Sequence, residues 1–185
     1  MANNFSKSLD HWVEQAQGGD AEAFGKIYDE LVKPVYRYIY YRVEPQIAED
    51  LTEEAFLKAW KNLPKYKKTK HPFSAWVFRI AHNLVCDHYR KHKENFEIDE
   101  NIADENQDTN PKRKLNLKLN QLKLKKAINK LPEKYQQVIL LKYINEEDNA
   151  TIASAIGKTE GAVRTIQFRA LKKLKTLLKE KAEDF

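Results

Sequence analysis

A helix-like run near the C-terminal end of the chain carries the side chains that a DNA-reading surface needs. In the segment 161–175, GAVRTIQFRALKKLK, apolar residues recur at helical spacing and leave basic, polar and aromatic residues on the opposite face. Arginine can grip guanine edges with two hydrogen bonds, glutamine can read adenine, and lysine can neutralise phosphates. A basic amphipathic helix packed in a bundle is the alternative. The residues available on the outer face are Arg164, Thr165, Gln167, Phe168, Arg169, Lys172 and Lys173.

The residues before this run match the spacing of a helix-turn-helix, a motif that presents its second helix to the major groove. Ala153 is small enough to let a second helix cross closely, Gly157 suits a left-handed turn, and Val163 can anchor the second helix. Thr159 can cap that helix, and Glu160 favours its positive end. Because turn, cap and apolar pattern coincide, we predict a DNA-binding motif here.

Two other clusters could support metal-dependent catalysis. An acidic cluster could hold magnesium, and two histidines four residues apart could bind zinc; they are Glu49, Asp50, Glu53 and Glu54, and His88 with His92. Catalytic carboxylates usually converge from several elements, however, and the histidine pair lacks a third ligand. The sequence also has no glycine-rich phosphate loop and no nucleophile motif. We therefore expect no enzyme, no catalytic residue, no metal site and no cofactor.

Charge is sharply segregated along the chain, although the formal net charge is only +6. The net charge is −6 for residues 1–57, +9 for 58–93, −7 for 94–110 and +10 for 111–185. Two basic blocks separated by an acidic one indicate two surfaces for a polyanion, and solvated helical faces are the alternative.

The composition also indicates the cellular compartment of the protein. No apolar run approaches the roughly 18 residues that a membrane helix needs, and the N-terminus lacks the features of a signal peptide. A single cysteine, Cys86, excludes an internal disulfide. We expect a cytoplasmic protein without membrane insertion.

Scarce glycine and proline, with abundant Lys, Leu, Ala and Glu, predict an all-α protein. We expect two small helical domains at residues 20–93 and 115–185, an N-terminal extension at 1–19, and an acidic flexible linker at 94–114.

The apolar pattern places three helices in the first domain. One begins after Asp20, a good N-cap, and should be kinked or split at Pro34. A second spans Gln46 to Leu63, and a third follows Pro72. In the second domain, helices at 115–131 and 133–144 precede the helix-turn-helix.

Several segments, in order, resemble conserved regions of the extracytoplasmic-function (ECF) subfamily of sigma-70 factors. Residues 47–60, IAEDLTEEAFLKAW, and 73–90, FSAWVFRIAHNLVCDHYR, are similar to two helices of the family's second region. Leu131-Pro132 and residues 161–171, GAVRTIQFRAL, resemble its fourth region. The resemblance covers about residues 20–93 and 120–178, with the acidic linker between them.

This resemblance implies an alternative sigma factor that supports promoter opening and transcription initiation. Its partners would be core RNA polymerase, through the beta-prime clamp and the beta flap, promoter DNA, and an anti-sigma factor. The clamp would meet Glu49, Asp50, Glu53 and Glu54. The minus-ten element would meet Tyr66, Lys67, Lys68, Lys70, Arg79, His82, Asn83, Asp87 and Arg90. The minus-thirty-five element would meet Arg164, Thr165, Phe168, Arg169 and Lys172.

The alternative is a helix-turn-helix repressor or activator that binds DNA without acting as a sigma factor. It would explain the C-terminal half of the chain, but not the acidic helix, the aromatic and basic helix, or the linker.

Overall fold

The computed structural model of the protein describes residues 2–68, 71–92 and 111–180. Lys70 and residues 94–110 of the predicted linker lie outside the described residues. Every regular element in the described ranges is a helix, which confirms the all-α prediction. The predicted domain boundaries remain predictions.

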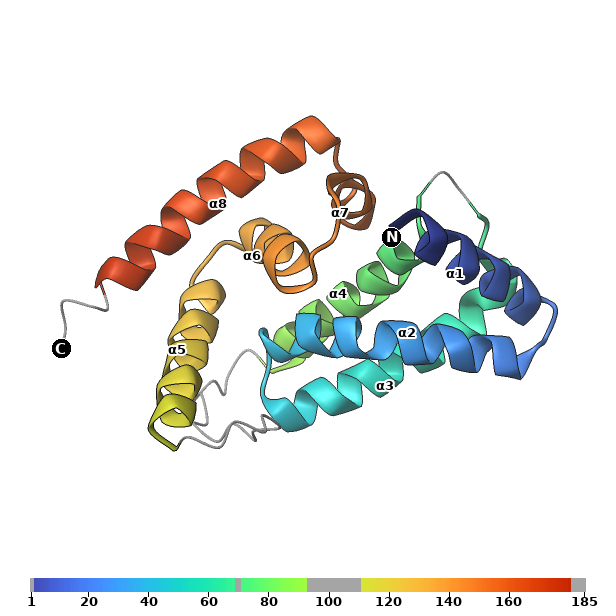
Figure 1. Ribbon diagram of the computed structural model, residues 1–185, viewed down its shortest axis with the longest axis horizontal. Coiled ribbons are helices and arrows are strands. Elements are labelled where there is room, and N and C mark those ends of the chain that lie inside the picture. The colour runs from blue at the N-terminus through green and yellow to red at the C-terminus, as the bar shows by residue number, and fades with distance from the viewer. Residues whose placement is uncertain (1, 69–70, 93–110, 181–185) are drawn as a thin grey trace.

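The N-terminal half is a bundle of four α-helices with one short 3₁₀ turn (Figure 1). Its elements are α1 (Ala2–Gln17), α2 (Ala21–Tyr40), α3 (Pro45–Asn62), η1 (Leu63–Lys65) and α4 (Phe73–Lys91). Asp20 caps α2 as expected, because its carboxylate accepts a hydrogen bond from the Ala23 amide at 3.1 Å.

The sequence left open whether the first helix is kinked or split at Pro34. Helix α2 is not split there. It continues to Tyr40 with Pro34 inside it. The residues on both sides of the proline, Leu31 and Val35, are buried in the core. Their burial offsets the hydrogen bond that a proline cannot donate.

The C-terminal half begins with α5 (Pro111–Asn129), which ends two residues before the end of the helix predicted at 115–131. The predicted helix at 133–144 is α6 (Glu133–Ile139) continued by a π-helical turn, η2 (Leu140–Ile144). The last two helices, α7 (Asn149–Ile156) and α8 (Glu160–Glu180), are the predicted helix-turn-helix.

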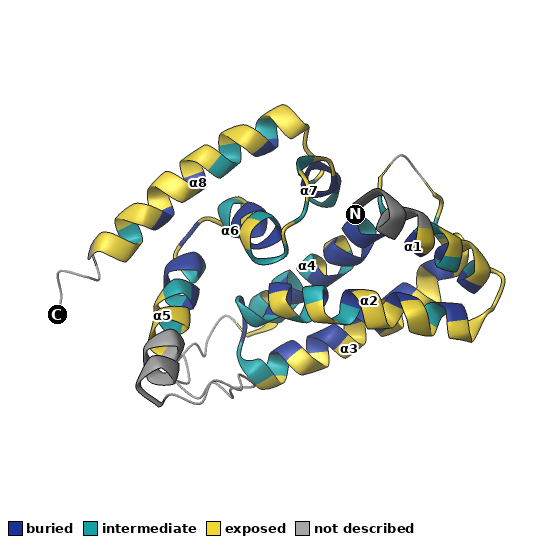
Figure 2. Ribbon diagram, in the orientation of Figure 1, coloured by how far each residue is buried: buried dark blue, intermediate teal, exposed yellow. Residues whose placement is uncertain are grey.

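Buried apolar side chains from the two halves form one continuous cluster. Helix α4 of the first half packs against α7 of the second, and α2 touches η2 (Figure 1). Figure 2 shows buried positions along the facing sides of these helices, whereas α8 is exposed along most of its length. The two halves therefore lie against each other.

Candidate functional site

The turn between α7 and α8 has the geometry that the sequence predicted for a helix-turn-helix. Gly157 ends α7 in the left-handed conformation, with φ of 64°, and the Lys158 amide bonds back to the Ala153 carbonyl at 2.9 Å. At the start of α8, Thr159 Oγ1 accepts a hydrogen bond from the Ala162 amide at 3.2 Å. Val163 is fully buried. These contacts fix the direction in which α8 leaves the turn.

The outer face of α8 presents all five residues that were expected at the minus-thirty-five element. Phe168 exposes 72% of its surface, which is unusual for a large aromatic side chain in a folded domain. Gln167, on the same helix, is not one of these five residues. Its side-chain amide donates a hydrogen bond to Asn149 Oδ1 at 2.9 Å and so ties α8 to α7. The exposed residues are Arg164, Thr165, Phe168, Arg169 and Lys172.

The acidic cluster lies on the outer face of α3. Its four carboxylates are all exposed: Glu49, Asp50, Glu53 and Glu54. Glu54 forms an ion pair with Lys58 one turn later, at 2.9 Å. All four come from one helix rather than converging from several, so the geometry is that of a charged contact surface and not of a catalytic metal site.

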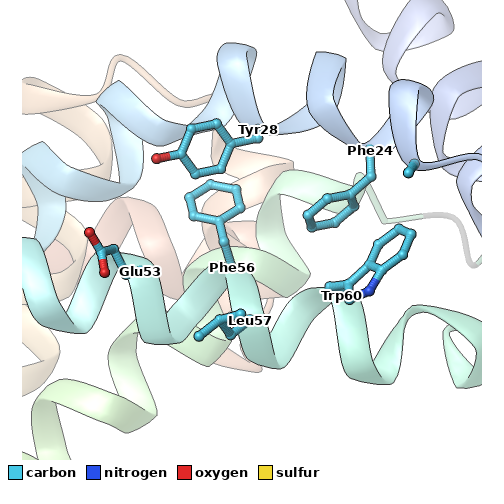
Figure 3. A pocket seen from close by; sticks show the side chains of 7 residues that line it. Phe24, Tyr28, Glu53, Phe56, Leu57 and Trp60 are labelled. Carbon is cyan, nitrogen blue, oxygen red and sulfur yellow. The ribbon is translucent and has the colours of Figure 1, made fainter.

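An apolar pocket of about 440 Å³ lies beside this acidic face, between α2 and α3 (Figure 3). Phe24 packs on Trp60 with ring centroids 4.7 Å apart, and Tyr28 packs edge-on against Phe56 at 4.8 Å. Leu57 is 57% exposed and Trp60 is 37% exposed. We call Phe24, Tyr28, Phe56, Leu57 and Trp60 the apolar pocket; Glu53 forms part of its lining.

Sequence reasoning missed this pocket as a binding feature. Phe56, Leu57 and Trp60 lie in the segment 47–60 that carries the family resemblance, but only its acidic residues were expected to meet a partner, and one signal could have added the apolar ones. Leu57 and Trp60 stand three residues apart on α3, between the charged positions that face solvent. An apolar pair on a charged face is the pattern of a contact surface.

The loop after η1 carries the first residues expected at the minus-ten element, beginning with Tyr66, and it is anchored through Tyr66. The Tyr66 ring packs against Phe73 at 5.1 Å and Trp76 at 5.0 Å, so both Tyr66 and Trp76 belong to an aromatic cluster. Lys67 is exposed. Lys68 forms ion pairs with Asp10 at 3.4 Å and Glu14 at 2.9 Å.

The predicted minus-ten residues of α4 follow one face of that helix, and α7 covers part of it. The Arg79 guanidinium donates to the Ser154 carbonyl of α7. Asn83 and Arg90 are exposed, and Arg90 pairs with Asp87. His82 is only half-buried, yet it too is engaged by groups from other helices, described below.

Comparisons with known proteins show the family of the chain. The family model for Sigma-70 region 2 matches residues 27–95, and the model for Sigma-70, region 4 matches residues 121–174. The ECF RNA polymerase sigma factor BldN of Streptomyces coelicolor is 36% identical over 184 residues, which cover 98% of this chain and 70% of BldN. The chain belongs to the ECF RNA polymerase sigma factors. The resemblance read from the sequence is thereby confirmed, and a repressor that acts without polymerase is not favoured.

A second curated relative supports the same assignment, and a solved structure shares the fold. The ECF RNA polymerase sigma factor SigW of Bacillus subtilis is 30% identical over 181 residues, which cover 91% of this chain and 95% of SigW. The sigma factor RpoE, solved with the anti-sigma factor NepR from Bartonella quintana, superposes with a TM-score of 0.68. It is 20% identical and covers 86% of this chain and 98% of that chain, and so shows a shared fold.

In this ECF sigma factor the two domains meet at a polar cluster that sequence reasoning did not anticipate. We call Tyr38, Arg42, His82, Cys86 and Glu133 the domain joint. Arg42 is only 3% exposed, and its Nη1 donates to Tyr38 Oη at 3.1 Å and to His82 Nδ1 at 2.9 Å. The Cys86 thiol donates to Glu133 Oε1 at 2.7 Å, and His82 Nε2 lies 3.3 Å from the same oxygen.

The protonation states of the joint follow from its burial. Burial, reinforced by the Arg42 charge, lowers the pKa of His82 to about 4. The imidazole is therefore neutral near pH 7, and its contact with Glu133 is a hydrogen bond from Nε2–H rather than an ion pair. Burial, followed by the hydrogen bond to Glu133, raises the pKa of Cys86 to about 11, which keeps the thiol protonated.

His82, Cys86 and Glu133 also have the ligand types of a zinc site, and their ligand atoms lie within 4.8 Å of one another. Arg42 argues against that use. Since Arg42 donates to Nδ1, the ring proton sits on Nε2, and the atom facing Glu133 has no lone pair for a metal. The cluster is a hydrogen-bonded joint, in which Arg42 Nε alone among the joint's buried side-chain N and O atoms has no hydrogen-bond partner.

A second polar contact between the domains involves a buried lysine. Lys125 Nζ donates to the Val43 carbonyl at 2.7 Å and lies 4.3 Å from the centre of the Tyr40 ring. Burial lowers the pKa of Lys125 to about 8. This contact links α5 to the turn between α2 and α3.

Across the part of the chain that the structure describes, no helix is long and apolar enough to span a membrane.

Proposed function

We propose that this sigma factor docks on core RNA polymerase through the acidic face of α3 and the apolar pocket beside it. Four exposed carboxylates lie on α3 before an apolar patch that is centred on Leu57 and Trp60, and one of them, Glu53, lines the pocket. Interfaces of this kind gain most of their affinity from a few aromatic or aliphatic anchors, while the charged rim sets orientation and association rate. The clamp of the beta-prime subunit, which the family resemblance implies as the partner, would then meet both features.

We propose further that promoter DNA is held by two separate surfaces. The outer face of α8 would enter the major groove at the minus-thirty-five element, and it is free to do so because its five candidate residues are exposed. The loop after η1 and the polar face of α4 would hold the opened minus-ten element. This role requires captured bases and a basic surface, and no bond needs to be hydrolysed.

These two DNA surfaces differ in their contacts with the rest of the chain, although Arg79, Asn83 and Arg90 of α4 are exposed. Residues of α4 that are candidates for minus-ten binding are engaged by the second domain, through Ser154 for Arg79 and Glu133 for His82. The acidic face of α3 and the outer face of α8 are open. We infer that polymerase and the minus-thirty-five element can bind first, and that minus-ten binding requires the domains to separate.

The single observation that carries the proposal is the exposed apolar pair Leu57 and Trp60 beside an acidic face, on a helix separate from the basic recognition helix. It is tested by in vitro transcription with core polymerase and two reciprocal variants. Trp60→Ala should lower the affinity for core polymerase by about tenfold or more, since it removes a central anchor. Arg169→Ala should leave that affinity unchanged and lower promoter-dependent initiation, by about fivefold to a hundredfold for one lost base contact.

Each outcome of the reciprocal test decides one surface. If Arg169→Ala weakens polymerase binding and initiation equally, α8 is not a dedicated DNA surface. If Trp60→Ala leaves polymerase affinity intact, the pocket is not the docking site. Initiation at discrete promoters only when the wild-type chain is added would support the function as a whole.

An anti-sigma factor is proposed as a further partner. The support is the solved complex of a sigma factor of the same fold with the anti-sigma factor NepR. A partner of this type would act by covering the surfaces named above.

A further inference from the structure

Helix α1 (Ala2–Gln17) has no role in the function proposed so far. The match to Sigma-70 region 2 begins at residue 27, so α1 lies outside it. The helix is nevertheless part of the first domain. Leu9, Val13 and Ala16 are buried, and α1 packs on α2 and touches both α4 and η1 (Figure 1).

The last residue of α1, Gln17, reaches the start of the candidate minus-ten loop. Its Nε2 donates to the Leu63 carbonyl at 3.0 Å and to the Tyr66 carbonyl at 2.6 Å. Leu63 and Tyr66 bracket the 3₁₀ turn that begins the loop. A side-chain amide has two N–H donors, so one glutamine satisfies both carbonyls and fixes their spacing.

Two further contacts hold the same stretch of loop. The Tyr66 ring is packed between Phe73 and Trp76, so the loop is anchored to the start of α4 as well as to α1. Lys68 pairs with Asp10 and Glu14 of α1, and the nearby ammonium lowers the pKa of Glu14. Both ion pairs are exposed and contribute little to stability. The directed restraint on the backbone therefore comes from Gln17.

We propose that Gln17 is a positioning residue for promoter opening, which fixes the loop from Pro64 to Lys68 in the geometry that captures the opened minus-ten strand. The proposal rests on the function proposed for this loop. A loop that must trap an unpaired strand gains from being ordered beforehand, because the ordering cost is then not subtracted from binding. Lys67, the exposed lysine one residue after Tyr66, is the group that this arrangement would present to DNA.

The test uses the full chain with core polymerase and a matched pair of variants. Gln17→Met keeps the length of the side chain and its helix propensity but removes both donors. Gln15→Met makes the same change two residues earlier, at an exposed position of α1. Promoter opening is followed by the fluorescence of 2-aminopurine placed in the minus-ten element, and polymerase affinity is measured separately.

We expect Gln17→Met to reduce opening about tenfold, the size of effect that two ordinary hydrogen bonds provide. Its affinity for core polymerase should stay within about twofold of wild type, and Gln15→Met should resemble wild type in both assays. Opening by Gln17→Met at the wild-type rate, in a chain of unchanged melting temperature, would overturn the proposal. An equal loss of opening and of polymerase affinity would do so too, since it would indicate general damage.

Two more variants separate the possible failures. If Gln17→Met lowers the melting temperature strongly, Gln17→Asn replaces it, because that shorter amide stays polar but cannot reach both carbonyls. It should show the same selective loss of opening, and wild-type opening by this variant would overturn the proposal. Lys67→Ala tests the loop itself. If Lys67→Ala opens promoters normally, the proposed function of the loop fails; if only Lys67→Ala is defective, the role of Gln17 fails alone.

Discussion

The domain joint predicts that Glu133→Gln shifts the free chain toward a form in which the two domains are separated. The Glu133 carboxylate accepts a hydrogen bond from Cys86 at 2.7 Å, and its Oε1 lies 3.9 Å from Arg42 Nη2. Glutamine keeps the shape and one acceptor oxygen of this side chain. It removes the negative charge that faces a guanidinium almost without solvent contact.

The size of the effect follows from how well each partner is shielded from water. Removing one partner of a fully buried ion pair costs about 3–5 kcal/mol. The Glu133 side chain, however, is 56% exposed, so solvent screens much of the attraction, and exposed pairs contribute about 0–1 kcal/mol. We expect a loss of about 1 kcal/mol, which corresponds to about a fivefold change in the ratio of separated to joined domains.

The assay is the binding of a single-stranded minus-ten oligonucleotide, followed by fluorescence anisotropy. Under the proposed function, this ligand binds the α4 face that α7 partly covers, so its apparent affinity should be reduced by the fraction of chains in which that face is closed. Glu133→Gln should therefore bind up to about fivefold more tightly than wild type. Glu22→Gln is the matched control, because it removes the same charge from an exposed pair with Lys26 on α2. If both variants gain affinity equally, only the net charge matters, and the reasoning about the joint is refuted.

Three other predictions concern pH, charge and the core. Burial, followed by the charge of neighbouring Asp148, raises the pKa of Glu147 to about 7, well above the ordinary value of a glutamate. This carboxyl therefore costs stability as pH rises from that ordinary value to 7, so Glu147→Gln should raise the melting temperature at pH 8 and have no effect near pH 4. The cost is up to about 3 kcal/mol at 1.4 kcal/mol per unit. Glu53→Lys should slow association with core polymerase and weaken its dependence on salt, which stopped-flow mixing measures. Phe78→Ala should lower the free energy of unfolding by about 3–5 kcal/mol in urea titrations, because Phe78 is fully buried.

Much of the fold was predictable because its signals are local. Asp20, Gly157 and Thr159 each act within four residues of their own position, so spacing alone located a cap, a left-handed turn and a second cap. Whether the helix continues through Pro34 does not depend on local sequence signals alone. A proline inside a helix has a fixed cost, and whether the helix continues depends on what the flanking residues bury, which only the packed structure reveals.

The candidate surfaces also divide into those that local sequence signals predict and those that depend on long-range packing. The exposed faces of α3 and α8 follow from helical period, since residues three and four apart share a face. The domain joint could not be found like this, because Arg42 and Glu133 meet across 91 positions and each is an ordinary surface residue type. Gln17 was equally hidden, since its partners Leu63 and Tyr66 are backbone carbonyls, which carry no residue-type signal.

The overlap between the domain joint and the candidate DNA face has a physical reason. A helix face that binds an opened DNA strand carries donors such as Arg79, which need acceptors whether or not DNA is present. In the free chain, the Ser154 carbonyl in the last turn of α7 accepts from Arg79, at the negative end of a helix dipole. Glu133 likewise places a carboxylate beside Arg42 and His82. The second domain thus supplies the kind of acceptor that DNA phosphates would supply. Under the proposed function, the two sets of acceptors compete for the same donors, and strengthening the joint should weaken minus-ten binding by the same free energy.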